Sequence, residues 1–289
     1  MKTRLLSACL VLVALCSASA QVVINEYSCS NLDQFPDNYD KHEDWIEIYN
    51  TSSSPVSMAG YYLSDDEDEP KKWAFPTTLS IPGNSFYLVW ASGRNEVTDD
   101  GVHASFKLTQ SKNNPDHIVF TDQNGTELAN IEVSKTQLDH SMGRQTDGGT
   151  QWRIMKNPTP GTSNNNTPSG IAYAGRPDVN IDGGFYQDSV FVVVTSTEPN
   201  ATVRYTLNGN EPTNTSTIYT EPIKIDHTTV LKVRTFSNAT TILPSFVQFN
   251  TYFINDTHNL PVISIGSNDV ETLANGSQGL RPRGSVEYF

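Results

Sequence analysis

Short runs rich in Val, Ile, Phe, Tyr and Trp recur along this chain, separated by Gly, Pro, Asn and Asp. Such runs bounded by turn residues are typical of β-strands, and no apolar pattern of helical period persists beyond two turns. The sequence therefore predicts an all-β protein built as sandwiches of short strands. In the first half, the expected strands are residues 45–49, 61–63, 85–90, 117–121, 127–133 and 151–155.

The alternation is clearest in Asp44-Trp45-Ile46-Glu47-Ile48-Tyr49-Asn50. Trp45, Glu47 and Tyr49 would lie on one face of a strand, and Ile46 and Ile48 on the other. This pattern predicts a half-buried strand, followed by a turn over residues 50–55. Further turns are predicted at residues 122–125 and 147–149, where Asn and Gly tolerate positive φ.

This segment and a series of motifs around it resemble the lamin tail domain. The other motifs are Ile24-Asn25-Glu26, Gly60-Tyr61-Tyr62-Leu63-Ser64-Asp65-Asp66, Trp73-Ala74-Phe75-Pro76, Leu88-Val89-Trp90-Ala91-Ser92-Gly93-Arg94, Ser141-Met142-Gly143-Arg144 and Thr159-Pro160-Gly161. The resemblance covers about half the chain and implies an immunoglobulin-like β-sandwich over residues 21–163, used for binding and scaffolding. Because one fold hosts many functions, it does not by itself imply an activity.

The N-terminus has the composition of a secretory signal peptide. Lys2 and Arg4 precede an apolar run over residues 5–16, and Ala18-Ser19-Ala20 supplies the small residues of a cleavage site. We expect residues 1–20 to be removed and the protein to be secreted or exposed at the cell surface. Leu6-Ser7-Ala8-Cys9 also matches a bacterial lipoprotein cleavage box, but cleavage there would leave almost no apolar region before it.

The cysteines and the charge narrow the class of protein further. Loss of Cys9 and Cys16 with the signal peptide leaves only Cys29, which cannot form an internal disulfide and is interpreted as a small buried hydrophobe. The formal net charge of −13 argues against nucleic acid as a partner, because phosphate binding requires clustered Lys and Arg. No second apolar run approaches the roughly 20 residues that span a bilayer, so no transmembrane segment is expected.

A second module is predicted beyond a polar segment without pattern, residues 164–176, which is interpreted as a linker. Alternation resumes at residues 189–194, 202–207 and 229–234. The run Val203-Arg204-Tyr205-Thr206-Leu207-Asn208-Gly209-Asn210-Glu211-Pro212-Thr213, together with Gly183-Gly184-Phe185-Tyr186, Ser245 and Tyr252, resembles the chitobiase and β-hexosaminidase C-terminal domain. This resemblance implies a second immunoglobulin-like sandwich over residues 177–255, with Asn208-Gly209 at a hairpin turn.

The last residues, 256–289, are similar to the opening of the spore-coat CotH kinase-like family. The motifs are Leu260-Pro261-Val262-Ile263-Ser264-Ile265, Arg281-Pro282 and Val286-Glu287-Tyr288-Phe289. A tail of this length cannot bury two strands against anything of its own, so it is expected to be the truncated start of a third domain. The nucleotide- and metal-binding positions of that family would lie beyond Phe289.

Two acidic segments have residue types that bind cations. Asp178-Val179-Asn180-Ile181-Asp182-Gly183 fits the first half of a calcium loop, but Ser189 occupies the position of the bidentate carboxylate, which favours a structural turn. Asp65-Asp66-Glu67-Asp68-Glu69 could hold a hard cation weakly or form a solvated turn, and we favour the turn. The six histidines have no ligand-like spacing, so no metal site is predicted.

Three further patterns have both a functional and a structural interpretation. Asp139-His140-Ser141 contains the residue types of a nucleophilic triad, but neighbours on an extended chain point apart. Trp45, Trp73, Trp90 and Trp152 could form a platform for sugar rings, although two or more are expected in the core. Eight N-x-Ser/Thr sequons would accept glycans in a eukaryotic secretory pathway, whereas in a bacterium they would simply reflect a chain rich in Asn, Ser and Thr. They begin at Asn50, Asn124, Asn165, Asn200, Asn214, Asn238, Asn255 and Asn275.

The leading hypothesis is a secreted or cell-surface, non-catalytic pair of sandwiches that binds a protein or extracellular polysaccharide and positions a following domain. One alternative is the N-terminal part of a secreted CotH-type kinase-like enzyme, with activity only in sequence beyond Phe289. Another is a carbohydrate-binding adjunct. No catalytic, cofactor-binding or metal-binding residue is predicted within residues 1–289.

Overall fold

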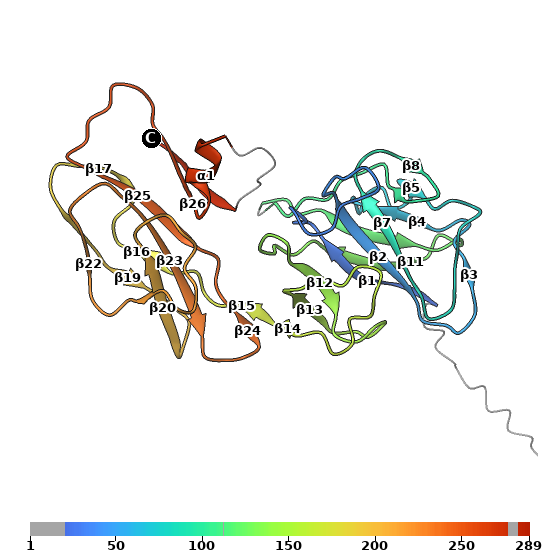
Figure 1. Ribbon diagram of the computed structural model, residues 1–289. Coiled ribbons are helices and arrows are strands. Elements are labelled where there is room, and N and C mark those ends of the chain that lie inside the picture. Colours follow the sequence, from blue (N-terminus) through green and yellow to red (C-terminus); the bar gives the residue numbers. More distant parts are fainter. Residues whose placement is uncertain (1–20, 112, 277–282) are drawn as a thin grey trace, which may run out of the picture.

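A computed structural model describes residues 21–111, 113–276 and 283–289 (Figure 1). The predicted signal peptide, residues 1–20, lies outside the described residues. As predicted, the protein is all-β and consists of two immunoglobulin-like sandwiches in tandem. Among the described residues the helical content is the single short helix α1 (Val270–Ala274), and no helix there is long and apolar enough to cross a membrane.

The first domain packs an eight-stranded sheet against a four-stranded sheet. The larger sheet has the order β14 (Ser169–Gly170), β13 (Trp152–Met155), β12 (Ser141–Arg144), β1 (Val22–Ser28), β2 (Asp44–Asn50), β7 (Phe86–Ala91), β9 (Val102–His103), β8 (Glu96–Val97). The smaller sheet has the order β11 (Glu127–Glu132), β10 (His117–Thr121), β4 (Tyr62–Ser64), β5 (Trp73–Ala74), and β3 (Val56–Ser57) pairs separately with β6 (Ser80–Ile81).

The core of the first domain gathers apolar side chains from both sheets. Ile46 and Ile48 of β2 are fully buried there together with Ile118 and Phe120 of β10. Cys29 lies half-buried against this cluster, in partial agreement with its interpretation as a buried hydrophobe. Each buried aliphatic or aromatic side chain contributes about 1.5–3 kcal/mol, so packing carries the stability of a domain with no disulfide among its described residues.

Strand β2 is buried on both faces, and the prediction of a half-buried strand is wrong on this point. Trp45 and Glu47 are as inaccessible as Ile46 and Ile48. Phe35, from the loop before β2, packs edge-on against Trp45 with ring centroids 6.5 Å apart. Residues 159–164 cover Glu47, whose carboxylate accepts a hydrogen bond from Gly161 N at 2.6 Å. Coverage by loops distant in sequence explains the difference.

The second domain is smaller and packs a five-stranded sheet against short strand pairs, at the left of Figure 1. Leu231, Val233 and Tyr252 are fully buried in its core. The main sheet has the order β17 (Gly184–Tyr186), β25 (Gln248–Ile254), β23 (Thr229–Ser237), β20 (Ala201–Thr206), β21 (Thr217–Ile218). The pairs are β18 (Val190–Val192) with β22 (Ile223–Ile225), and β16 (Asp178–Val179) with β19 (Val194–Thr195).

The turn prediction at Asn208-Gly209 requires correction. β20 ends at Thr206 and its hairpin partner β21 begins only at Thr217, so these residues open a long loop instead of a two-residue turn. Gly209 has φ +75°, as a glycine in a turn should, and its N donates to Val230 O at 3.1 Å. The loop folds back onto the neighbouring strand β23, which places Glu211 beside it.

The predicted linker, residues 164–176, carries two short strands. β14 extends the large sheet of the first domain, and β15 (Ala172–Tyr173) pairs in parallel with β24 (Ile242–Leu243) of the second. Asn164 is fully buried, and its Nδ2 donates to Arg144 O at 3.0 Å. The connection is therefore built into both sandwiches, as Figure 1 shows between the two bodies.

The two strands predicted in the C-terminal tail are present as β26 (Ile263–Ser267) and β27 (Gly284–Tyr288), an antiparallel ribbon. One side of the ribbon meets the second domain: Lys232 Nζ donates to Gly266 O at 3.0 Å, and Thr251 Oγ1 donates to Glu287 Oε2 at 2.5 Å. The other side is apolar and exposed. Its exposed side chains are Ile263, Ile265, Val286 and Tyr288.

Candidate functional site

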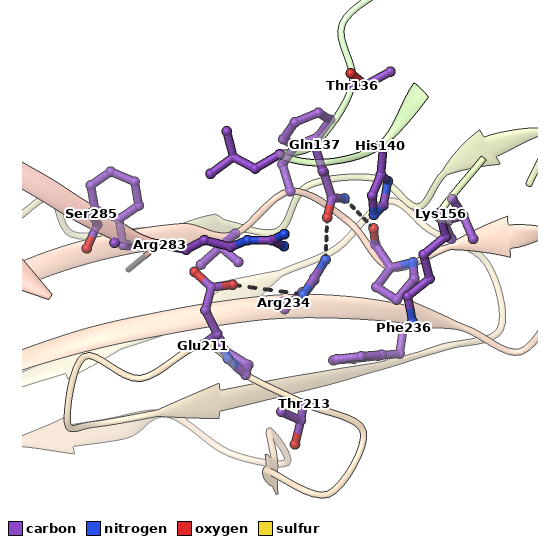
Figure 2. Close-up of a pocket in the computed structure, with 18 of the residues that line it drawn as sticks. Thr136, Gln137, His140, Lys156, Glu211, Thr213, Arg234, Phe236, Arg283 and Ser285 are labelled. Atoms are coloured by element: carbon purple, nitrogen blue, oxygen red, sulfur yellow. Dashed lines mark hydrogen bonds and ion pairs between the residues drawn. The ribbon is translucent and has the colours of Figure 1, made fainter. Parts of the chain in front are cut away.

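A cavity of about 720 Å³, here called the interdomain pocket, lies between the two sandwiches. The first domain supplies residues 135–138, His140 and Lys156, and the second supplies Arg234 and the phenylalanines at 236, 246 and 249. Arg283, just before β27, closes one side. Figure 2 shows Gln137 of the first domain and Arg234 of the second pointing toward one another.

Each wall is set by a strand or by a loop next to one. The segment between β11 and β12 carries Lys135 and His140, and Lys156 follows β13 directly. Arg234 projects from the middle of β23, the longest strand of the second domain. Because β-strands hold successive side chains on opposite faces, the position of Arg234 in β23 fixes the direction of its guanidinium.

Arg234 joins the two domains within the pocket. Its Nη2 donates to Gln137 Oε1 at 2.5 Å, and its Nε donates to Ser245 O at 2.8 Å. Gln137 Nε2 in turn donates to Pro244 O at 2.8 Å, so one glutamine of the first domain contacts two segments of the second. Glu211 lies 3.9 Å from Arg234 Nη1, a weak ion pair at the pocket edge.

Arg283 and His140 add further contacts between the domains and the tail. Arg283 Nη2 pairs with Asp139, whose carboxylate is fully buried. His140 Nδ1 lies 2.8 Å from Tyr173 Oη, which also accepts the hydrogen bond of Gln137 N. Burial, and then the positive charges of Arg283, Arg234 and Lys156, lower the pKa of His140 to about 4, so it is neutral at physiological pH.

The lining of the pocket is basic although the protein is acidic. Lys135, Lys156, Arg234 and Arg283 line it, against the one carboxylate of Glu211. Lys135 Nζ lies 5.2 Å from the centre of the Phe246 ring, and neither Lys135 nor Lys156 has an ion-pair partner in the described part of the chain. The arrangement can hold an anion against a partly apolar wall.

The residues of the suspected triad point to three different partners. Asp139 accepts hydrogen bonds from Leu32 N and Asp33 N, His140 contacts Tyr173, and Ser141 Oγ donates to Glu26 Oε1 at 2.5 Å. The three side chains diverge, although Asp139, with φ +60°, lies in a turn and not on the extended chain that the prediction assumed.

Of the two acidic segments, residues 178–183 begin as a strand and not as the predicted turn, whereas residues 65–69 form a turn as predicted. Asp178 and Val179 form β16, and Asn180 Oδ1 accepts the hydrogen bond of Val193 N at 2.7 Å. In the run 65–69, Asp65 pairs with Lys72 at 2.7 Å and Asp66 accepts the hydrogen bond of Asp68 N. Over residues 21–111, 113–276 and 283–289, no group of three or more His, Cys, Asp or Glu is placed to hold a metal.

Three of the four tryptophans, at positions 45, 73 and 90, are buried, which confirms their core interpretation and contradicts a four-residue sugar platform. Trp152 is half-buried beneath the Arg144 guanidinium. Asn50 is also buried, and its amide donates to the carbonyls of Ser54 and Ile81. It cannot accept a glycan in the folded state, whereas the other seven sequon asparagines are exposed.

A second polar cluster lies in the first domain, away from the pocket. Glu26 of β1 and Glu47 of β2 are opposite each other in the sheet register, and both are fully buried. Glu26 accepts hydrogen bonds from Ser141 and Thr159, and Glu47 accepts them from Asn25 Nδ2 at 3.0 Å and Gly161 N at 2.6 Å. Burial raises the pKa of both carboxyls, that of Glu47 to about 8. Through Thr159 and Gly161, the cluster binds the segment that leads to the second domain.

Sequence reasoning missed the pocket because its cations are spread from residue 135 to residue 283. Nothing in the sequence around Arg283 predicts that it meets Asp139. Two sandwiches must dock before these side chains converge.

Family models match two parts of the chain. Residues 16–135 match the Lamin Tail Domain model, and residues 181–244 match the Chitobiase/beta-hexosaminidase C-terminal domain model. Both resemblances drawn from the motifs are thereby confirmed. No curated protein matches the chain significantly. The CotH resemblance of the tail lies outside both matched ranges and stays a prediction.

Proposed function

We propose that this chain is a secreted or cell-surface pair of non-catalytic binding modules whose ligand site is the interdomain pocket. The observation that carries the proposal is the composition of the pocket wall: two sandwiches contribute cations and aromatic rings to one cavity of about 720 Å³. Ligand sites of this size occur preferentially where domains meet. The ligand is an extracellular polysaccharide or protein, and the pair holds a following domain in place.

The two matched families agree with binding and scaffolding. Immunoglobulin-like sandwiches bind partners through side chains and loops on a rigid frame. The Chitobiase/beta-hexosaminidase C-terminal domain is named after enzymes that act on sugars, which supports a polysaccharide over a protein as the ligand.

An array of extracellular polysaccharides and proteins tests this proposal. The purified chain should bind a subset of the array members. The double variant Lys135→Glu, Lys156→Glu should no longer bind them. Both lysines are exposed, so their replacement leaves the core intact. Lys41→Glu, at an exposed lysine outside the pocket, is the matched control and should bind as the unmodified chain does. If the double variant binds the array as strongly as the unmodified chain does, the ligand site lies elsewhere.

A further inference from the structure

We infer that the interdomain pocket takes a carboxylated oligosaccharide, a short chain of sugar rings that bear uronate-type carboxylates. This inference rests on the proposed function and names the ligand class of the same site. Three features of the pocket carry it: its charge, its aromatic wall and its hydrogen-bonding side chains.

The positive charge that lines the interdomain pocket favours an anionic ligand of modest size. Lys135 and Lys156 face the pocket without an ion-pair partner among the described residues, and the Arg283 side chain is 44% exposed despite its contact with Asp139. Lysine and arginine donate charge-assisted hydrogen bonds to carboxylates, which are about twice as strong as neutral ones. The remaining surface carries the acidic excess of the chain, so a long polyanion is repelled outside the pocket while a short one is held within it.

The aromatic wall of the interdomain pocket favours a ligand whose rings have apolar faces. Phe236, Phe246 and Phe249 are half-buried and line the second-domain side of the pocket. A sugar ring presents a face of C–H groups that packs on such rings, while its hydroxyls need donors and acceptors at the rim. Amides suit this task because each supplies both. Gln110 of the first domain and Asn214 of the second line the pocket. The Gln110 Oε1 already accepts the hydrogen bond of Thr136 N at 2.7 Å, which leaves its NH₂ group as the donor.

The geometry is less suited to a peptide. One mode of peptide recognition adds an extended strand to a free sheet edge. Leu243 of β24 lines the pocket, and this short strand is already paired with β15. Recognition here falls to side chains, as it does for a sugar.

The test is calorimetric titration of the purified chain with three uronate tetramers. The first contains galacturonate, the second contains mannuronate and guluronate, and the third contains glucuronate and N-acetylglucosamine. At least one should bind. The methyl ester of that tetramer keeps the rings and removes the charge, and it should bind at least about tenfold more weakly. The double variant Lys135→Glu, Lys156→Glu should bind every tetramer at least about tenfold more weakly than the unmodified chain does. Lys41→Glu should bind as the unmodified chain does, and affinity should fall as salt rises.

The outcomes separate the inference from the proposed function. If neutral sugars, or a tetraglutamate peptide, bind as tightly as the uronates and the double variant abolishes that binding, the pocket is a ligand site but the ligand class is wrong. If none of the three uronates binds, or if the double variant binds them normally, the inference is overturned. If no array member and no titrant depends on the pocket, both proposals fail.

Discussion

At the residue scale, the buried pair Glu26 and Glu47 links the stability of the first domain to pH. Neither carboxyl has a cation beside it in the described structure, and each is held by neutral donors. Removal from water disfavours the charged form, which is why the pKa of Glu47 rises from 4.5 to about 8, with Glu26 adding repulsion. Glu47 is therefore mostly protonated at neutral pH.

The sign of the resulting pH dependence follows from linkage. Because the folded pKa lies above the unfolded one, the protonated Glu47 contributes stability that is fully present below about pH 4.5 and lost as pH rises through 8. The melting temperature should fall between pH 5 and pH 9. Glu47→Gln cannot titrate and should show a shallower fall, although its NH₂ meets the Gly161 donor and lowers the unfolding free energy at pH 5 by about 1–3 kcal/mol.

Thermal melts across this pH range make the comparison. Glu127→Gln, at an exposed position on β11, is the control and should keep the slope of the unmodified protein. An equally steep fall in Glu47→Gln would mean that other groups carry the dependence.

At the scale of elements, alternation located the strands well. The segment 117–121 was predicted with the bounds that β10 has, and 45–49 lies within β2. The failures have a common cause. Burial of Glu47, the long loop after β20 and the strands inside residues 164–176 all depend on contacts between segments far apart in sequence, which a local pattern does not contain.

The tail ribbon offers a test at this scale. Thr251 Oγ1 lies 2.6 Å from Ser264 Oγ and 2.5 Å from Glu287 Oε2, and so connects β25 to both β26 and β27. Thr251→Val keeps the shape and removes these bonds, at a cost of about 1–2 kcal/mol. Amide hydrogen exchange of residues 263–267 and 284–288 should accelerate, while β23 stays protected.

Thr235→Val is the matched control for the ribbon. Thr235 is equally buried, and its hydroxyl contacts Ser196 instead of the ribbon. Exchange in the ribbon that is unchanged by Thr251→Val, or accelerated as much by Thr235→Val, would contradict this anchoring.

At the scale of the whole molecule, the fold class could be predicted and the pocket could not. Two families of motifs indicated two sandwiches, but the docking of one on the other depends on single side chains such as Gln137 and Tyr173. Their sequence neighbourhoods, a loop and a polar connection, give no sign of a partner. The basic pocket therefore could not be predicted from a sequence whose formal net charge is −13.

Docking predicts that both domains tumble together. Gln137→Ala with Tyr173→Phe removes the bonds to Pro244, Arg234 and His140 without touching either core. Nitrogen-15 relaxation should give one rotational correlation time for both domains in the unmodified protein and shorter, unequal times in this variant. Tyr39→Phe, which loses an exposed hydrogen bond to Glu96, should behave as the unmodified protein does. Equal times in the double variant would show that the remaining contacts, namely the connection and the pair of Arg283 with Asp139, hold the domains together without these bonds.

The most direct test of the central claim is a nuclear magnetic resonance titration of the labelled chain with the ligand that the array selects. The account predicts that the shifted amides come from both sandwiches at once, around Lys135 and His140 in the first and around Arg234 and Phe246 in the second. Shifts confined to one sandwich, or centred on strands away from this cavity, would contradict a ligand site between the domains.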